Sequence, residues 1–459
     1  MSRFEGDRAA VPGPGDHVVV VGLGVSGEAA ARHLLRLGAS VTVVDDGDDP
    51  VLRDRAVSLG EARVLLGAAG DPGVGAEAAL VIASPGVPER ARILAAAREA
   101  GVPIWSEVEL AYRLARAPIL GVTGTNGKTT TTRMLAEALA EAGFRSAAAG
   151  NIGRPLIDAV VEEHDVVVAE LSSFQLHHIV SFRAPVGALL NIAADHLDWH
   201  GGFDSYVAAK ARLFENQGAD DVAVYHDDAV CSGAAATRGR RVAFHESVVP
   251  SGGAGVADGW IVVPEGRVVE CEALRARGAP IRANAVAAAA AACAFGAAPE
   301  AVGRALTAFV PLPHRMELVA ELNGVAYVND SKATNPHAVL AALEGLRDVV
   351  LIAGGRNKGL DLGAIAAGAD GVTQVVAIGE SAVEVVDAFS AASIPAERAT
   401  SMDDAVGRAA AHARPGGTVL LSPGCASFDM FADYKARGEA FRAAVKRLET
   451  AHTTGEGIA

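Results

Sequence analysis

The sequence predicts an α/β protein with three domains in succession. Apolar runs rich in valine and isoleucine alternate with glycine turns and helix-period segments along most of the 459 residues. Continuous apolar strands that alternate with helices are typical of parallel sheets covered on both faces. Because a single domain usually contains about 100–200 residues, a chain of this length also requires more than one core. We therefore expect a Rossmann-like N-terminal domain, a P-loop-type central domain with a parallel sheet, and a Rossmann-like C-terminal domain.

Two hinge-like stretches divide the predicted strands into three series. The βα rhythm restarts after residues 101–119 and again after residues 309–319, which places domain boundaries near residues 106 and 312. Residues 217–280 are more polar and richer in glycine, and they predict a small β-rich excursion within the central domain, with short strands in DVAVYHDD and RVAFHE. The predicted domains are residues 1–106, 107–312 and 313–459. The runs interpreted as strands are residues 17–24, 40–46, 79–84, 118–124, 165–173, 187–196, 325–330, 348–355, 373–380 and 417–424.

Composition argues against several classes of protein. The net charge of −15 disfavours a nucleic-acid backbone or an anionic membrane as the main partner. The longest apolar stretch, residues 285–298, is mostly alanine, so we expect a packed helix rather than a membrane span. The first sixteen residues lack the apolar core of a secretory signal, and the four cysteines show no metal-binding spacing. We expect a reduced, cytoplasmic protein without membrane insertion.

The strongest motif is a glycine-rich loop between a predicted strand and a predicted helix. Its sequence, GTNGKTT, departs from the strict Walker A pattern because Val122 stands where the first glycine is expected. Backbone N–H groups, the helix N-terminus and a lysine can still bind phosphates, and a threonine hydroxyl can bind Mg²⁺. An ordinary glycine turn that caps a helix is the weaker alternative. The predicted phosphate-binding residues are Gly124, Thr125, Asn126, Gly127, Lys128, Thr129 and Thr130.

A second glycine loop, GLGVSG, follows the first predicted strand. Asp45 and Asp46 end the next strand, near the position where an acidic residue binds ribose in dinucleotide-binding folds. The motif alone is weak evidence, but its context favours a pyrophosphate or nucleotide over a structural turn. An NAD-dependent oxidoreductase is one interpretation, although it leaves the phosphate loop unused. SPGVP at residues 84–88 ends another strand and could line the same ligand.

Further polar residues follow strands in the central and C-terminal domains. Glu170 ends an apolar strand, the usual place for a Mg²⁺ ligand in a P-loop domain, and His196 ends the next strand. Lys210 lies on a helix, where composition alone indicates a surface lysine. In the C-terminal domain, the clusters at 329–336, 354–359 and 422–438 each follow a strand, which is where open α/β sheets bind ligands. Arg315, Lys332 and Lys358 supply positive charge for an anionic ligand.

Together these motifs resemble those of the Mur ligases along essentially the whole chain. The resemblance rests on GLGVSG, SPG, GTNGKTT, GNIG, ELSSFQL, DHLD, YxxAK at residues 206–210, PHRME, NDSKATNP, GGRNKG and SPGCASFDMF. GTNGKTT is shared with folylpolyglutamate synthetases, whereas GLGVSG, ELSSFQL, NDSKATN and SPGCAS single out the members that add D-glutamate. The resemblance implies a cytoplasmic, monomeric enzyme of peptidoglycan precursor synthesis. Such an enzyme uses ATP to phosphorylate UDP-N-acetylmuramoyl-L-alanine and joins D-glutamate to the acyl phosphate.

The resemblance also implies roles for individual residues. The catalytic residues would be Lys128, Glu170, His196 and Lys210, with Lys210 carbamylated. Two Mg²⁺ ions would be held by Thr129, Glu170, His196 and the modified Lys210. ATP would contact the phosphate loop together with Asn284, Arg315 and Asp330. The UDP-substrate would be bound by Gly22, Gly24, Val25, Ser26, Gly27, Asp45, Ser84, Gly86, Asn151, Ser172, Ser173 and Gln175. D-Glutamate would be bound by Lys332, Thr334, Lys358, Ser427 and Phe428.

One departure from the family pattern concerns the nucleotide. The family usually has a His-Asn pair three residues before a second Asn, whereas this chain has Pro280 and Ile281 followed by Asn284. The first Asn of the family pattern therefore has no counterpart here, Asn284 could suffice for the adenine contact, and the nucleotide preference requires a direct test. Three alternatives stay open: a Mur-type ligase for a different amino acid, a nicotinamide-dependent oxidoreductase, and a P-loop binding protein without ligase activity.

Overall fold

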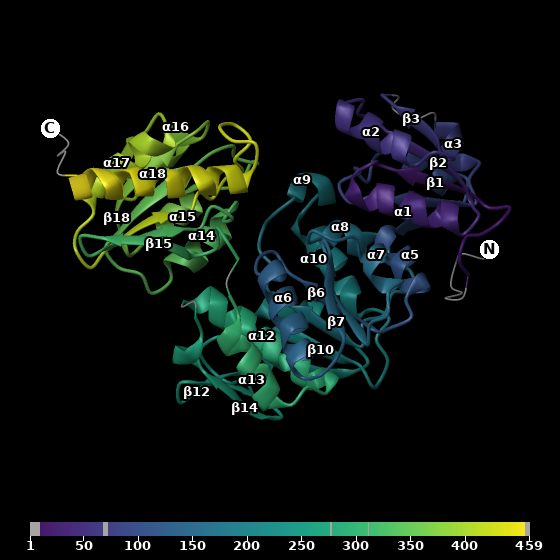
Figure 1. The fold of residues 1–459 in the computed structure, drawn as a ribbon, viewed down its shortest axis with the longest axis horizontal. Helices are drawn as coiled ribbons and strands as arrows, with labels where there is room; N and C mark the ends of the chain where they lie inside the picture. The colour runs from purple at the N-terminus through teal and green to yellow at the C-terminus, as the bar shows by residue number, and fades with distance from the viewer. Residues whose placement is uncertain (1–9, 68–71, 276–277, 311, 455–459) are drawn as a thin grey trace. The chain divides into compact units, whose positions relative to one another are not determined.

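The computed structural model describes residues 10–67, 72–275, 278–310 and 312–454 (Figure 1). The contacts divide the chain into two compact units, which are considered separately. The first unit contains residues up to 309 except for two short segments, and the second contains residues from 310 onward together with these segments, 193–195 and 274–282. The α/β architecture with three sheet-centred domains is confirmed.

The N-terminal sheet has five parallel strands in the order β3-β2-β1-β4-β5. The strand order reverses between β1 and β4, and such a switch point opens a crevice at the carboxyl ends of the strands. The strands are β1 (His17–Val21), β2 (Ser40–Asp45), β3 (Arg63–Leu66), β4 (Leu80–Ala83) and β5 (Ile104–Ser106). The helices are α1 (Val25–Arg36), α2 (Pro50–Ser58), α3 (Pro72–Ala76), α4 (Arg92–Glu99) and α5 (Glu107–Leu114).

The central sheet has six parallel strands in the order β11-β10-β9-β6-β8-β7. Its strands are β6 (Ile119–Thr123), β7 (Ser146–Gly150), β8 (Val166–Glu170), β9 (Val186–Leu189), β10 (Val222–His226) and β11 (Arg240–Phe244). The prediction for residues 217–280 was partly wrong, because β10 and β11 extend the main sheet. Only β12 (Gly255–Ala257), β13 (Trp260–Val263) and β14 (Gly266–Glu270) form a separate antiparallel sheet.

The helices of the central domain range from four to seventeen residues in length. The predicted alanine-rich helix is confirmed, and its residues 285–292 are almost fully buried, so small side chains allow close packing. Among the described residues, each helix is either too short or too polar to cross a bilayer. The helices are α6 (Lys128–Glu141), α7 (Leu156–Val160), α8 (Ser173–His177), α9 (Leu197–His200), α10 (Phe203–Ala211), α11 (Ala229–Ala234), α12 (Ala279–Phe295) and α13 (Pro299–Ala308), with 3₁₀ turns at Arg212–Phe214 and Cys271–Ala273.

The C-terminal sheet is mixed rather than purely parallel. Its order is β15-β16-β20-β17-β18-β19, and β15 pairs antiparallel with β16 at one edge. The strands are β15 (Glu317–Leu322), β16 (Val325–Asn329), β17 (Val349–Gly354), β18 (Val372–Ile378), β19 (Ala396–Arg398) and β20 (Thr418–Leu421). One face packs on α14 (Pro336–Leu343), α15 (Gly363–Ala367) and α16 (Ala382–Ala391), and the other on α17 (Met402–His412) and α18 (Tyr434–Thr454).

The hinge-like stretch at residues 101–119 contains regular, packed structure. It forms the edge strand β5 and the helix α5, whose residues Val108, Leu110 and Ala111 are fully buried. Both α1 and α5 pack on α7 of the central domain, and one hydrophobic core continues from the N-terminal sheet into the central sheet. The chain therefore passes between these two sheets through packed structure.

Candidate active site

The phosphate loop lies where the strand order of the central sheet places it. Strand β6 has β8 on one side and β9 on the other, so the loop after β6 is flanked by the ends of two neighbouring parallel strands. Gly127 has φ 81°, and a Cβ atom there would lie 2.2 Å from Asn284 Oδ1. Lys128 begins α6 and donates from Nζ to the carbonyl oxygens of Gly124 and Thr125, at 2.8 Å each. The predicted strand–loop–helix arrangement is confirmed, with the lysine at the helix N-terminus.

Two residues that the sequence interpretation missed hold this loop in place. The side chain of Asn191 accepts a hydrogen bond from Asn126 N at 2.8 Å and donates one to Asn126 O at 3.1 Å. The main-chain oxygen of Asn191 accepts from Thr125 N. Tyr206 Oη lies 3.0 Å from Thr125 Oγ1. Asn191 follows β9, so its position beside a strand end was a signal that could have been used.

Glu170 has the surroundings of a cation ligand. It ends β8, next to the loop strand, and is only 2% exposed. Its Oε1 accepts a hydrogen bond from Asn151 Nδ2 at 2.9 Å, while Oε2 is buried and has no hydrogen-bond partner among the described residues. A buried carboxylate oxygen without a donor is costly, and Mg²⁺ prefers oxygen ligands of this kind. The residue therefore fits the Mg²⁺ role that the sequence predicts.

Lys210 is not the surface lysine that composition alone indicated. It lies on α10, is 1% exposed, and donates from Nζ to Gly124 O at 2.8 Å. Its Nζ also lies 4.6 Å from the centre of the Tyr206 ring. His196 directly precedes α9 and has a left-handed backbone, with φ 52°. Its ring packs edge-to-face with that of Phe174, with the ring centres 4.9 Å apart. The structure thus places Lys210 directly at the phosphate loop.

The N-terminal glycine loop lies at the switch point between β1 and β4. Gly22 has φ 91°, and a Cβ atom on Gly27 would lie 1.9 Å from Gly22 O, so both positions require glycine. Ser84, after β4, donates from Oγ to Gly22 O at 2.8 Å. Asp45 accepts from Leu23 N at 2.6 Å and from Gly47 N at 2.8 Å. The predicted binding loop is thus stabilised by the carboxylate that was expected to bind ribose.

A buried carboxyl group, Glu107, joins this loop to the central domain. Its Oε1 accepts from Gln175 Nε2 at 2.7 Å, and Ser26 also donates to the carboxyl group. Burial raises the pKa of Glu107 from 4.5 to about 7, against the effect of these donors. Gln175 is itself fully engaged, because its Oε1 accepts from the backbone and hydroxyl groups of Ser172 in a capping box that begins α8. Sequence reasoning missed Glu107 because it follows a three-residue edge strand, β5.

Asp330, one of the two predicted ATP-contact residues of the C-terminal domain, belongs to a buried polar network. Asp330 accepts from Ser422 Oγ at 3.0 Å and from Met316 N at 3.2 Å. Burial raises the pKa of Asp330 to about 7, although these donors and the positive charges of Arg315 and Arg437 oppose the change. Arg315 lies between two residues with left-handed backbones, His314 (φ 63°) and Met316 (φ 45°).

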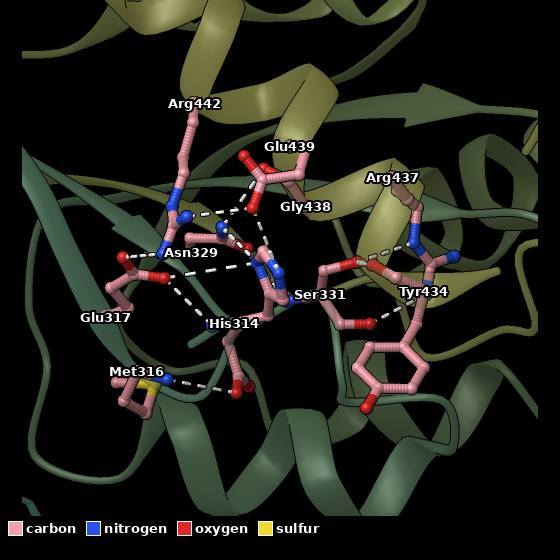
Figure 2. A network of polar contacts seen from close by, with 11 residues as sticks. His314, Met316, Glu317, Asn329, Ser331, Tyr434, Arg437, Gly438, Glu439 and Arg442 are labelled. Atoms are coloured by element: carbon pink, nitrogen blue, oxygen red, sulfur yellow. Dashed lines mark hydrogen bonds and ion pairs between the residues drawn. The ribbon is translucent and has the colours of Figure 1, made fainter. Parts of the chain in front are cut away.

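Figure 2 shows what holds this segment. His314 lies beneath Gly438, where any Cβ would meet the ring at 2.2 Å, and it contacts Asn329 Nδ2 through Nδ1 at 3.0 Å. Arg437 is 1% exposed and donates to Ser331 Oγ, Ser331 O and Cys425 O at 2.8–3.0 Å. Arg437 therefore ties the loop after β16 to the loop after β20.

The predicted amino-acid-binding residues come from three neighbouring strand ends. They follow β16, β20 and β17, which are adjacent in the sheet, so the expected convergence of these loops is present. Lys332 Nζ lies 4.0 Å from the centre of the Tyr434 ring. Ser427 is buried, whereas Phe428 is 64% exposed and Lys358 is also exposed. Thr334 lies half-buried in the loop before α14. The geometry offers cations and a hydroxyl group, which suit a carboxylate-bearing ligand.

Comparison with protein families shows what the chain is similar to. Three family models match: the Mur ligase MurD-like N-terminal domain at residues 16–106, the Mur ligase middle domain at residues 122–249, and the glutamate ligase domain of Mur ligases at residues 314–425. A UDP-N-acetylmuramoylalanine–D-glutamate ligase of Frankia casuarinae is 47% identical over 443 residues, covering 94% of both chains. The enzyme of that name from Streptomyces coelicolor is 42% identical, covering 95% of this chain and 98% of its own.

Solved structures with the same fold are more distant in sequence. A pseudomurein peptide ligase type C from Methanothermus fervidus has a TM-score of 0.60 at 19% identity, covering 94% of this chain and all of that one. The UDP-N-acetylmuramate–alanine ligase MurC of Thermotoga maritima has a TM-score of 0.57 at 19% identity, covering 95% of this chain and all of that one. Family models that together match most of the chain, and relatives above 40% identity over nearly its whole length, lead to one conclusion: this chain belongs to the Mur ligase family.

Proposed function

We propose that this chain is the ATP-dependent ligase that joins D-glutamate to UDP-N-acetylmuramoyl-L-alanine in cytoplasmic peptidoglycan precursor synthesis. One observation carries the proposal: the ammonium groups of Lys128 and Lys210 both donate to Gly124 O, beside the strand that ends in Glu170. A nicotinamide-dependent oxidoreductase would have no use for this arrangement. The curated relatives that carry the D-glutamate ligase name support the choice of substrate.

The chemistry consists of two displacements that need positioning and charge neutralisation. A carboxylate oxygen of the substrate attacks the γ-phosphorus of ATP, the bond to the β,γ-bridging oxygen breaks, and ADP leaves. The amine of D-glutamate then attacks the acyl carbon, and phosphate leaves as the amide forms and the amine gives up its proton. Lys128 and the N-terminus of α6 bind the phosphates, so they stabilise charge that moves toward ADP in the first step.

The metal ligands proposed are Thr129, Glu170, His196 and Lys210. Mg²⁺ bound by these residues would neutralise phosphate oxygens during transfer. The free Oε2 of Glu170 fits this role, whereas an unmodified lysine is a hydrogen-bond donor and cannot ligate a cation through its ammonium group. We therefore infer that Lys210 is carbamylated, because carbamylation replaces its positive charge with a carboxylate at the same buried position.

The remaining predicted residues retain their proposed roles. The glycine loop at 22–27, with Asp45, Ser84, Gly86, Asn151, Ser172, Ser173 and Gln175, would form the UDP-substrate site. For Gln175 and Asp45 we propose a positioning role, since their polar atoms are engaged by neighbouring residues. Arg315 and Asp330 are proposed for ATP, and Lys332, Thr334, Lys358, Ser427 and Phe428 for D-glutamate. The domain boundaries near residues 106 and 312 and the monomeric state stay predictions.

Phosphate release from ATP tests the proposal. We expect release to require both UDP-N-acetylmuramoyl-L-alanine and D-glutamate, and to be much slower with L-glutamate or other amino acids. Stimulation by a different amino acid would instead favour a related Mur-type ligase. Because Pro280 and Ile281 replace the usual His-Asn pair, ATP should be compared with GTP in the same assay. A Lys210→Ala variant should be inactive and partly rescued by short carboxylic acids; an inactive variant without rescue contradicts carbamylation.

A further inference from the structure

A cluster of Glu89, His177 and His178 lies outside the phosphate and metal site described above. Glu89 follows β4, His177 ends α8 and His178 comes directly after it, so the cluster joins the loop after SPG to the helix that carries Ser173 and Gln175. Glu89 Oε2 lies 3.2 Å from His177 Nε2 and 3.3 Å from His178 Nε2. We propose that these three side chains form a binding site for a divalent transition-metal cation such as Zn²⁺.

Two of the three separations between ligand atoms suit a tetrahedral site. Metal–ligand bonds of about 2.0–2.2 Å at tetrahedral angles place two ligand atoms about 3.3–3.6 Å apart. The two carboxylate–imidazole separations, 3.2 and 3.3 Å, lie at the short end of this range, and all three ligand atoms lie within 4.8 Å of one another. Two imidazole nitrogens and one carboxylate oxygen are donors that suit Zn²⁺ or Co²⁺, whereas Mg²⁺ prefers six oxygens. Three protein ligands also leave one position for water.

The contacts within the cluster do not satisfy its buried atoms. Glu89 Oε2 and His178 Nε2 are buried and have no partner with hydrogen-bond geometry among the described residues, although they lie 3.3 Å apart. A cation between these atoms would give both of them the partner that the described residues do not supply.

The chain holds these ligands in place from the side away from the cation. Arg98 of α4 donates to the main-chain oxygen of Glu89 at 3.3 Å and pairs with Oε1, which leaves Oε2 for the histidines. Ser106 N donates to His178 O at 3.0 Å. Trp199 Nε1 donates to Val87 O at 3.0 Å, which fixes the loop that carries Glu89. Such outer contacts orient metal ligands in known sites.

The inference is tested by metal binding to the full-length protein, without reference to ligase activity. Chelator-treated protein in excess Mg²⁺ is titrated with Co²⁺, followed by its visible ligand-field absorption, and with Zn²⁺ by calorimetry. We expect one cation per chain, and at least tenfold weaker binding in His177→Ala and in His178→Ala. Circular dichroism and thermal midpoints without metal check that each variant folds.

A second cluster supplies the matched control. His226, Asp227 and His245 also lie within ligand distance of one another, at the ends of β10 and β11. His226→Ala should leave the affinity unchanged if the cation binds at Glu89. Unchanged affinity in both His177→Ala and His178→Ala, or loss of binding in His226→Ala alone, overturns the inference. Because the readout is binding, a failure here is distinguishable from a failure of the proposed ligase reaction.

Discussion

Replacing Glu107 with glutamine should change the pH dependence of stability. The free energy of unfolding of the variant, relative to that of the unmodified chain, should rise as the pH increases. Burial raises the folded-state pKa of Glu107 from 4.5 to about 7. Between these values the folded protein holds a proton that the unfolded chain has released. The stability contributed by this proton is complete below pH 4.5 and is lost as the pH rises through 7. Glutamine does not titrate, so the variant escapes this loss.

The magnitude follows from the difference between the two pKa values. At about 1.4 kcal/mol for each pH unit, burying the charged carboxylate costs about 3 kcal/mol well above pH 7. Between pH 5 and pH 8, the free energy of unfolding of Glu107→Gln should rise by about 2.5 kcal/mol relative to the unmodified chain. The glutamine can still accept from Gln175 and Ser26, and its amide group occupies the place of Oε2, which has no hydrogen-bond partner among the described residues.

Urea unfolding at pH 5, 6, 7 and 8 measures this difference. The chain has three tryptophans, so Trp199 and Trp260 are changed to Phe and the fluorescence of the buried Trp105 reports on the region around Glu107. Glu109→Gln is the matched control on the same helix. Glu109 pairs with the buried Arg113 at 2.7 Å, so its loss should destabilise the protein by about 3–5 kcal/mol. A difference between Glu107→Gln and the unmodified chain that is constant from pH 5 to 8 would refute the reasoning.

Three other substitutions probe the phosphate loop and the C-terminal network. Gly127→Ala should weaken binding of a fluorescent ATP analogue more than tenfold, because its Cβ would lie 2.2 Å from Asn284, whereas Gly143→Ala, at φ 96° with open space around it, should leave affinity unchanged. Asn191→Ala removes both side-chain bonds to the loop backbone and should also weaken ATP binding, by about tenfold, with a normal thermal midpoint; equal affinity would contradict its role. Arg437→Lys should lower the free energy of unfolding of the C-terminal domain by about 2–4 kcal/mol in urea, since an ammonium group cannot reach all three oxygens.

Most strands could be predicted because their apolar runs are long and end in polar motifs. The same rule brings the predicted residues Lys128 and Glu170 to the ends of the adjacent strands β6 and β8, since parallel neighbours bring their carboxyl ends together; their roles stay predictions. The missed elements are short or lie at edges: β5 has three residues, and β15 is antiparallel and only half-buried. The strands β10 and β11 were assigned to the wrong sheet because their apolar runs are brief, and sheet membership depends on partners distant in sequence.

Two buried residues could be recognised as buried only from tertiary contacts. Lys210 was proposed through the family motif YxxAK, whereas composition alone indicated a surface lysine; its burial and its contact with Gly124 O place it at the phosphate loop. Glu107 likewise reads as an ordinary acidic residue in the first turn of a helix. Its burial becomes apparent only when Ser26 and Gln175, from two different domains, meet at its carboxyl group.

The glycine loop at residues 22–27 shows why one motif does not determine a ligand. Its shape is set by contacts within the chain: Gly27 against Gly22 O, Ser84 on Gly22 O, and Asp45 on Leu23 N. These contacts would form around NAD or UDP alike, because they fix a turn rather than read a base or a sugar. What discriminates is the neighbouring chemistry. A phosphate loop with a buried lysine, beside a Glu170 oxygen that has no hydrogen-bond partner among the described residues, supports phosphoryl transfer, and a hydride-transfer enzyme has no use for it.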